Sequence, residues 1–388
     1  MKKLGICACY QHKNYGSQLQ SYATTVELAR RNIDFEVIRY KKKITPLLLV
    51  KSLPRLLNPV FINDRIIETS QKKMMLKLHP QLAQDNAVRN AAFDKFSQSR
   101  FKKLSPVYYG YEQLKEQSKK YTAVMVGSDQ LWSPSGITSN FYNLMFADDN
   151  TVKISYATSF GVSQINPKYH KIYNTFLNRL DFISVRENSG KKIVEELSSN
   201  KAEVVCDPVI LLDAEQWLKE IPNKRLYDEP YIFAYFLGKS AEYRDAVTKF
   251  AKQKGLKIVT EPHMDSYNKA DENFGDYTPF DIGPAEFVNL IRNAEYVFTD
   301  SFHGSVFSML YQKQFLVFNR YSDNSSSSKN SRIDSFCKNY GLSDRRYNGN
   351  IANVENEINY EAVLGKVDEH RQKSKAFLDK ALACFDNR

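Results

Sequence analysis

The stretch of sequence that decides the fold is residues 295–318, which read EYVFTDSFHGSVFSMLYQKQFLVF. A short apolar run at 295–299 is followed by a polar turn, an apolar segment of helical length at 305–312 and a second apolar run at 315–318. Short apolar runs separated by helices are typical of parallel strands that are buried on both faces. The stretch therefore predicts a strand–helix–strand unit of an α/β protein.

The same alternation extends outward over most of the chain. We expect further strands at residues 4–10, 35–40, 121–126, 152–157, 182–185, 202–206, 231–237 and 257–260, and helices at 18–31, 241–254 and 284–294. The pattern restarts after Asp228-Glu229-Pro230. We therefore expect two Rossmann-like domains with parallel sheets, at residues 1–228 and 229–352. Residues 41–120 are expected to form a mostly helical basic insertion, and residues 353–388 a helical tail that packs back on the first domain.

Length and composition narrow the class of protein. The chain has 388 residues, which is long for one core, and its 42 % hydrophobic and 26 % charged residues indicate a folded globular protein. The five cysteines show no metal-ligand spacing. Cys7, Cys9 and Cys206 lie in or at the end of apolar runs and are interpreted as small buried hydrophobes, which indicates a reducing compartment. No apolar run approaches the roughly 20 residues of a membrane span, and no signal-peptide pattern opens the sequence. We expect a cytoplasmic protein without a metal site.

The formal net charge is +11, and much of the excess lies within residues 41–103. A basic surface attracts phosphates, nucleic acid or an anionic membrane. No zinc-finger, RNA-binding or basic-helix motif is present, so no nucleic-acid partner is expected. Two interpretations of the basic segment stay open. It forms a solvated helical face, or it makes peripheral contact with anionic lipid or a lipid-linked phosphate substrate.

Polar residues follow one expected strand after another. In open parallel sheets, ligands bind beyond the carboxyl ends of the strands, so we expect these residues to line a cleft. They are Asn14-Tyr15-Gly16-Ser17, Gly127-Ser128-Asp129-Gln130 with Trp132, Thr158-Ser159-Phe160-Gly161, Arg186-Glu187-Asn188-Ser189, Asp207-Pro208, Glu261-Pro262-His263, Asp300-Ser301-Phe302-His303-Gly304 and Asn319-Arg320.

His303 is the sharpest candidate, because it follows an apolar strand and opens an apolar helix. A histidine there suits donation to an anion or proton transfer near neutral pH. Arg186 suits a bidentate grip on a carboxylate or phosphate, and an ion pair with Glu187 is the alternative. Gly16 allows a tight turn and Ser17 stands at a helix start, where free N–H groups favour an anion. A plain helix cap is the other interpretation of that turn.

Several of these motifs, in this order, resemble the polysaccharide pyruvyl transferase family, from about residue 5 to residue 320. The motifs are Asn14-Tyr15-Gly16-Ser17, Gly127-Ser128-Asp129-Gln130-Leu131-Trp132, Ser184-Val185-Arg186, Asp207-Pro208 and Asp300-Ser301-Phe302-His303-Gly304. The resemblance implies a GT-B-like fold, with two Rossmann-like domains facing across a cleft. It also implies phosphoenolpyruvate as donor substrate, no separate cofactor, and a pair of sugar hydroxyls as acceptor, giving a pyruvate ketal and phosphate.

The resemblance also suggests roles. His303 matches the histidine that holds or protonates the donor, and Asp129 is a candidate to orient or deprotonate the acceptor. The expected substrate-binding residues are Asn14, Tyr15, Gly16, Ser17, Ser128, Trp132, Ser159, Arg186, Ser301, Gly304, Arg320 and Arg332, and Trp132 or Phe160 is expected to stack on a sugar. Many members have Arg where this chain has Ser301, and we expect Lys313, Arg320, Lys329 or Arg332 to supply that charge.

The expected function is transfer of a pyruvyl group to a sugar of a lipid-linked surface-polysaccharide repeat unit. Two alternatives come from other considerations. A glycosyltransferase that uses a nucleotide sugar would share the fold, and a non-enzymatic binding module would dock through the basic segment.

Overall fold

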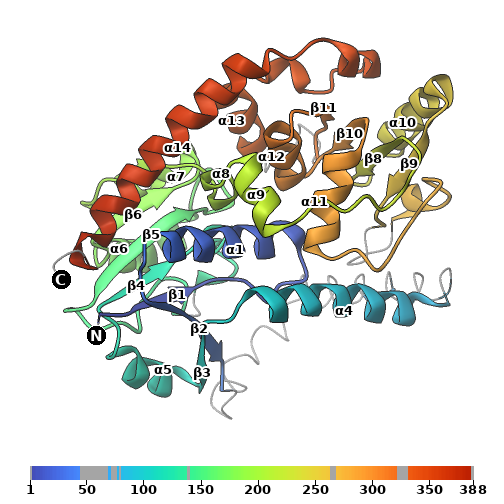
Figure 1. Cartoon of the computed structure of the whole chain (residues 1–388). Helices are drawn as coiled ribbons and strands as arrows, with labels where there is room; N and C mark the ends of the chain where they lie inside the picture. Colours follow the sequence, from blue (N-terminus) through green and yellow to red (C-terminus); the bar gives the residue numbers. More distant parts are fainter. Residues whose placement is uncertain are drawn as a thin grey trace.

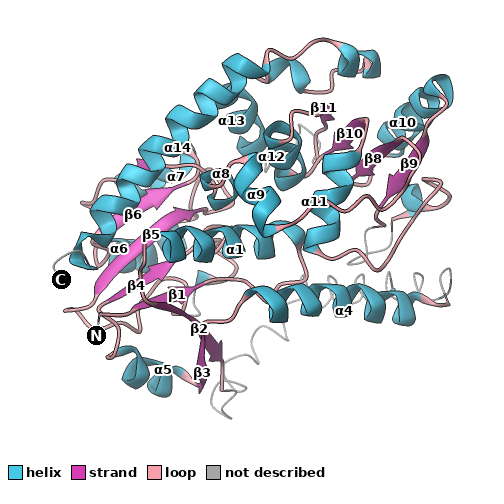
Figure 2. Cartoon of the chain, in the orientation of Figure 1, coloured by secondary structure: helices cyan, strands magenta, loops and turns pink. Residues whose placement is uncertain are grey.

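A computed structural model describes residues 2–43, 69–70, 77, 80–137, 140–262, 268–320 and 331–385. It contains two parallel sheets with helices on their faces (Figures 1 and 2). Its short 3₁₀ helices are η2 (Pro167–Tyr169), η3 (Lys269–Asp271), η4 (Ser343–Arg345), η5 (Ile351–Glu355) and η6 (Ala383–Phe385). The predicted α/β architecture with two parallel sheets is confirmed.

The first sheet has seven strands in the order β3-β2-β1-β4-β5-β6-β7, and every pairing is parallel. Its strands are β1 (Leu4–Cys7), β2 (Phe35–Lys41), β3 (Leu104–Tyr109), β4 (Ala123–Val126), β5 (Val152–Thr158), β6 (Phe182–Val185) and β7 (Glu203–Val204). Its helices are α1 (Tyr15–Arg30), α4 (Leu82–Arg100), α5 (Tyr111–Ser118), α6 (His170–Leu177), α7 (Asn188–Leu197), α8 (Pro208–Leu211) and α9 (Ala214–Glu220). The strand order reverses between β1 and β4, which makes a crevice at their carboxyl ends.

The second sheet has four parallel strands in the order β11-β10-β8-β9. The strands are β8 (Tyr231–Tyr235), β9 (Lys257–Thr260), β10 (Tyr296–Thr299) and β11 (Gln314–Val317). The helices are α10 (Ala241–Lys254), α11 (Pro284–Asn293), α12 (Phe302–Leu310) and α13 (Ser331–Tyr340). Here the order reverses between β8 and β10, so this sheet has its own crevice beside the start of α12.

Two helices tie the halves together (Figure 1). Tyr15 of α1 stacks on Phe287 of α11 with ring centroids 4.4 Å apart, and Phe93 of α4 packs on the same tyrosine at 4.7 Å. Farther along the chain, α14 (Tyr360–Leu382) returns to the first sheet. There the backbone N–H of Cys206 donates to Ser374 Oγ at 2.8 Å. The division into domains at 1–228, 229–352 and 353–388 stays a prediction.

The described part of residues 41–120 contains the helices α4 and α5, as expected, but it also contributes a strand to the first sheet. Leu104–Tyr109 forms β3, which pairs with β2 at the edge of the first sheet. Pro106 argues against a strand in the sequence, and an edge strand tolerates it because one of its sides needs no ladder hydrogen bonds. Residues 44–68 lie outside the described residues.

Two helices begin three residues earlier than the sequence predicts. Helix α1 begins at Tyr15 and α12 begins at Phe302, so Gly16 and His303 lie in first turns. Within the ranges described above, no helix combines the length and apolar character needed to cross a membrane.

Candidate functional site

The crevices of the two sheets meet in a cavity of about 210 Å³. The loops after β1 and β4 form one wall, and the loops after β8, β10 and β11 with the start of α13 form the other. The lining residues are Asn14, Ser17, Asp129, Gln130, Leu237, Asp300, Ser301, Phe302, His303, Arg320, Arg332 and Ile333. The structure thus brings together seven of the predicted site residues, namely Asn14, Ser17, Asp129, Ser301, His303, Arg320 and Arg332.

His303 is held from three sides. Ser301 caps α12 by accepting the N–H of Gly304 at 3.3 Å, which fixes the first turn. The imidazole packs directly on Gly16, where an added Cβ would lie 1.9 Å from Nδ1. Its Nε2 lies 3.5 Å from Asp207 Oδ2. The histidine is nearly buried, at 9 % exposure, so its orientation is set by the protein.

Asp207 is the buried carboxylate on which this side of the site converges. Its Oδ1 caps α8 by accepting the N–H of Val209 at 3.0 Å, and its Oδ2 accepts from Arg186 Nη1 at 2.7 Å. The hydroxyl of Ser128 lies 3.2 Å from the same oxygen. Burial alone would raise the pKa of Asp207, but His303 and Arg186 hold it well below its usual range. Asp207 is therefore an ionised group that positions both partners.

The sequence motif Asp207-Pro208 was noted, but Asp207 was missing from our predicted site residues. The available signal was a carboxylate directly after a strand and before a proline, which also fits a plain helix cap. The structure shows that it is both a cap and an ion-pair partner.

Arg186 makes the ion pair with Glu187 that was the alternative interpretation, at 3.0 Å, as well as the one with Asp207. Burial would lower the pKa of the guanidinium, but the two carboxylates hold it above its usual value. Its Cζ lies 4.8 Å from the ring centroid of Phe302, which lines the cavity, whereas Arg186 itself does not. Among the described residues, its buried Nη2 has no hydrogen-bond partner.

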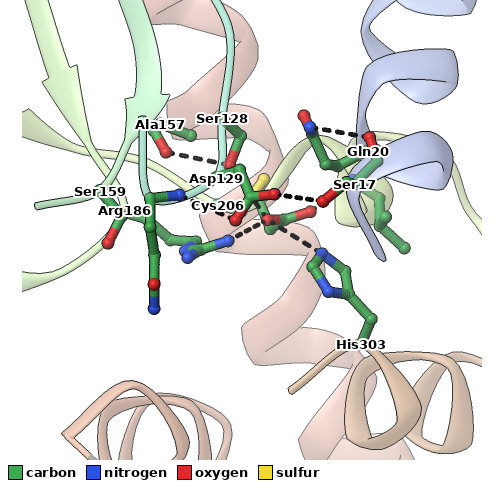
Figure 3. Close-up of polar contacts among 12 residues, drawn as sticks. Ser17, Gln20, Ser128, Asp129, Ala157, Ser159, Arg186, Cys206 and His303 are labelled. Atoms are coloured by element: carbon green, nitrogen blue, oxygen red, sulfur yellow. Dashed lines mark hydrogen bonds and ion pairs between the residues drawn. The ribbon is translucent and has the colours of Figure 1, made fainter. Parts of the chain in front are cut away.

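Asp129 lies on the opposite wall with a strained backbone, at φ 89°. Its Oδ2 accepts from the hydroxyl of Ser17, and its Oδ1 accepts the N–H of Gln130 at 2.8 Å (Figure 3). Burial would raise the pKa of Asp129, but the charge of Arg186, the Ser17 hydrogen bond and His303 lower it below its usual value. The cavity therefore holds an ionised carboxylate beside His303.

Guanidinium groups crowd around this cavity. Arg320 follows β11 and Arg332 lies on α13, and both line the cavity. The pKa of Arg332 is lowered by burial and by the nearby charges of Arg186 and Arg320. With the Gln130 amide oriented to accept, Arg332 Nη2 donates to its oxygen at 2.8 Å, but this contact neutralises no charge. A bound anion would relieve the repulsion among these cations.

Trp132 and Phe160 do not face the cavity, so the predicted stacking on a sugar is wrong. Trp132 is fully buried, donates its Nε1–H to the carbonyl of Tyr142 at 3.0 Å, and packs on Phe160 and Phe176. Both aromatic residues belong to the core beneath the loops, because the wide first sheet needs apolar cover there.

Other predicted contacts are supporting rather than lining residues. Tyr15 is buried between the halves, and its hydroxyl donates to the carbonyl of Ile282 at 3.0 Å. Ser159 is fully buried, and its N–H binds the carbonyl of Asp129 at 2.8 Å. Ser128 is buried behind the wall, and Gly304 packs α12 on Thr299, where a Cβ would lie 2.8 Å from the hydroxyl oxygen.

Of the basic residues considered in place of the arginine absent at Ser301, two are placed in the cavity and one is not. Arg320 and Arg332 line it. Lys313 donates to the carbonyl of Arg292 at 3.2 Å and is absent from the lining, so it does not supply the charge. Lys329 lies outside the described residues.

Within the described ranges, no group of three His, Cys, Asp or Glu side chains is placed to hold a metal ion. The expectation of neither metal nor cofactor stays a prediction.

Glu261 is a buried acid directly after β9, near Tyr15 and Arg89. Burial raises its pKa to about 8, although the Tyr15 hydroxyl and the Arg89 charge oppose the rise. A raised folded-state pKa means that stability is complete below the unfolded pKa and is lost as pH rises through about 8. We expect the free energy of unfolding, measured by urea denaturation, to fall between pH 5 and pH 9, by about 1.4 kcal/mol per pH unit at most.

The variant Glu261→Gln cannot ionise and should lose this part of the pH dependence. It is expected to be more stable than the unchanged protein at pH 9 and similar at pH 5. Parallel stability curves for the two proteins across that range would show that Glu261 does not titrate as its burial predicts.

Comparisons with known proteins give a consistent result. A family model described as polysaccharide pyruvyl transferase matches residues 14–322. Among solved structures, the UDP-N-acetylglucosamine 2-epimerase from Rickettsia bellii is similar over 99 % of this chain and 96 % of that chain, with 10 % identity and a TM-score of 0.54. No sequence among the curated proteins matches this chain.

Two more distant likenesses are the UDP-GlcNAc 2-epimerase from Methanocaldococcus jannaschii and heptosyltransferase II from E. coli. The first has 12 % identity and a TM-score of 0.49 over 95 % of this chain and 92 % of that one. The second has 10 % identity and a TM-score of 0.33 over 97 % of this chain and 100 % of that chain. The structural comparison shows the fold, which is GT-B-like. Because the family model spans most of the sequence, including every residue that lines the cavity except Arg332 and Ile333, the chain belongs to the polysaccharide pyruvyl transferase family.

Proposed function

We propose that this protein transfers the pyruvyl group of phosphoenolpyruvate to a sugar of a lipid-linked surface-polysaccharide repeat unit, in the cytoplasm. The observation that carries the proposal is the gathering of Arg320, Arg332 and His303 around one small cavity, with Arg186 close behind. Phosphoenolpyruvate carries a carboxylate and a phosphate, and each needs cations or N–H donors.

The size of the cavity supports a small donor. Pockets for drug-sized ligands measure roughly 300–1,000 Å³. The cavity lined by described residues measures about 210 Å³, which suits phosphoenolpyruvate better than a nucleotide sugar. The first turn of α12 adds backbone N–H groups at the cavity wall, where they favour an anion.

The reaction needs one acid and a base for each hydroxyl. Protonation of the methylene carbon gives an oxocarbenium-like centre, which the first sugar hydroxyl attacks as it loses its proton. The carbon–oxygen bond to phosphate then breaks, and phosphate leaves. The second hydroxyl attacks the same carbon and loses its proton, which closes the cyclic ketal.

We assign roles from the geometry. His303 delivers the proton or donates to the phosphate, and Asp207 keeps its ring in place from the buried side. Asp129 faces the cavity as a carboxylate and orients or deprotonates the acceptor hydroxyl. Arg320 and Arg332 bind the donor anion, and Arg186 holds Asp207.

The test measures phosphate release from phosphoenolpyruvate with aryl glycosides as acceptors and follows pyruvyl incorporation by mass. The variant His303→Gln should lose about 10²–10⁴-fold in turnover, because a positioned acid contributes that much. His12 is exposed and does not line the cavity, so His12→Gln is the control and should keep full activity. Both variants should unfold at the temperature of the unchanged protein.

Full turnover in His303→Gln would sink the site assignment. Product formed from UDP-N-acetylglucosamine and none from phosphoenolpyruvate would favour the glycosyltransferase alternative. If the folded protein neither bound phosphoenolpyruvate nor turned it over, the result would favour the non-enzymatic binding module.

A further inference from the structure

A second hollow lies well away from the candidate site. It is a groove of about 440 Å³ between α1, β2 and the C-terminal end of α4. Its apolar floor, which we call the groove floor, consists of Val26, Ala29, Phe35, Val37 and Phe101. Four basic side chains around it, which we call the rim cations, are Arg30, Arg100, Lys102 and Lys103. Apolar surface ringed by cations is unusual for a plain solvated face.

The rim cations form no ion pairs with the carboxylates that the structure describes. Within the described part of the chain, no Asp or Glu oxygen lies within ion-pair distance of any of them. Among the described residues that line the groove, Glu220 is the one acid, and its carboxylate accepts a hydrogen bond from the hydroxyl of Tyr22. The groove therefore carries an excess of positive charge.

Two of the rim cations are held over aromatic rings instead. The Cζ of Arg100 lies 5.6 Å from the ring centroid of Tyr22, and the Nζ of Lys103 lies 4.7 Å from that of Phe35. Lys102 donates to the carbonyl of Gln98 at 2.8 Å, which satisfies one N–H and no charge. Their stems cover apolar surface while the charged ends stay at the rim.

This combination selects an anionic amphiphile. An inorganic phosphate would use the rim and leave the floor wet, and an acidic peptide would need no apolar hollow. We propose that the groove binds an anionic membrane lipid, with the lipid phosphate among the rim cations and the upper part of one acyl chain on the groove floor. Binding here docks the protein on an anionic membrane surface through one end of α1.

The location fits a docking role. Helix α1 runs from the candidate site at Ser17 to the groove at Arg30, and a helix rises 1.5 Å per residue. The two ends are therefore about 20 Å apart, so lipid in the groove would not block the cavity. The inference does not rest on the proposed donor, because lipid binding is measured without turnover.

The experiment is co-sedimentation of the full chain with vesicles. In 0.1 M salt, we expect binding to vesicles with 30 % phosphatidylglycerol in phosphatidylcholine, and little binding to phosphatidylcholine alone. Each cation near an anionic surface contributes about a factor of five. The variant R100Q/K102Q/K103Q should therefore bind about a hundredfold more weakly.

A matched control removes the same charge elsewhere. Lys171, Lys249 and Lys252 are exposed and lie outside the groove, so K171Q/K249Q/K252Q should keep most of the binding. Equal loss in both triple variants would overturn the proposal in favour of diffuse attraction.

A second variant tests the apolar part without changing charge. Ala29 is exposed on the groove floor, so Ala29→Phe fills the hollow and should weaken vesicle binding at least tenfold. Unchanged binding of Ala29→Phe would also overturn the proposal, because the contact would then be electrostatic only. If soluble polyglutamate displaced the protein from vesicles at equal charge concentration, the groove would be a protein-binding surface instead.

Discussion

Replacing Asp207 by Asn is expected to destabilise the protein by about 3–5 kcal/mol, the range for breaking a buried ion pair. Asp207 is 1 % exposed, and the variant leaves Arg186 with Glu187 as its one direct ion-pair partner among the described residues. It also removes the carboxylate that Ser128 and the Nε2 of His303 face. The unfolding temperature should fall by about 10 °C, since 1 kcal/mol corresponds to roughly 2–4 °C in a domain of this size. Phosphate release should fall as well, because His303 loses the group that it faces.

The pH dependence separates this charge from general damage. The pKa of Asp207 is depressed in the folded state, so its stabilisation is present above the unfolded pKa of about 3.9 and is lost as pH falls below it. The stability difference between Asp207→Asn and the unchanged protein should therefore narrow below pH 4. Asp149→Asn is the control, because that carboxylate pairs with Arg179 while its side chain is 92 % exposed. A loss of stability no larger than in this control would contradict a central role for Asp207.

Replacing Gly16 by Ala is expected to remove about 10²-fold of the activity while leaving the fold almost unchanged. The new Cβ would lie 1.9, 2.4 and 2.6 Å from Nδ1, Cε1 and Cγ of His303, so the ring must move. A misplacement of about 1 Å can cost two orders of magnitude in rate. Gly16 lies in the first turn of α1, where alanine is the better helix former by up to about 1 kcal/mol. Gly16→Ala should therefore lower the activity while leaving the stability of the protein almost unchanged.

The control is Gly365→Ala in α14, where an added Cβ meets nothing within 4 Å. It should keep full activity. A double-mutant cycle then shows whether Gly16 acts through His303, because Gly16→Ala should add no further loss in a His303→Gln background. Additive losses in turnover would mean that Gly16 serves the site in another way.

Much of the fold could be predicted because its signals are local. Strand β6 and helix α10 were predicted at the residues where the structure has them, since apolar runs and helical periodicity need only neighbouring residues. Strand β3 was missed because Pro106 is a poor strand former. Residues 104–109 form a strand only because they pair with β2. The start of α12 was placed too late because Ser301, the cap, resembles any loop residue.

Several residues that line the cavity could be predicted, but the buried residues that hold them in place could not. His303, Asp129 and Arg320 could be placed in one cavity because strand ends in parallel sheets converge. Tertiary packing decides which loop residues face the cavity and which face the core. Trp132 was therefore predicted in the cavity, although it is buried in the core. The partnership of Asp207 with Arg186 and His303 joins residues far apart in sequence, and no local pattern specifies it.

The return of α14 to the first sheet has a consequence for the timing of assembly. The N–H of Cys206, next to the carboxylate that orients His303, is satisfied by Ser374, a residue translated 168 positions later. During synthesis, the N–H of Cys206 lacks this hydrogen bond until Ser374 has been translated, and His303 is itself translated well after the first sheet. The first half can collapse on the ribosome, but the surroundings of Asp207 are completed only when the last long helix arrives. Activity therefore reports that nearly the whole polypeptide has been made and has folded back on its beginning.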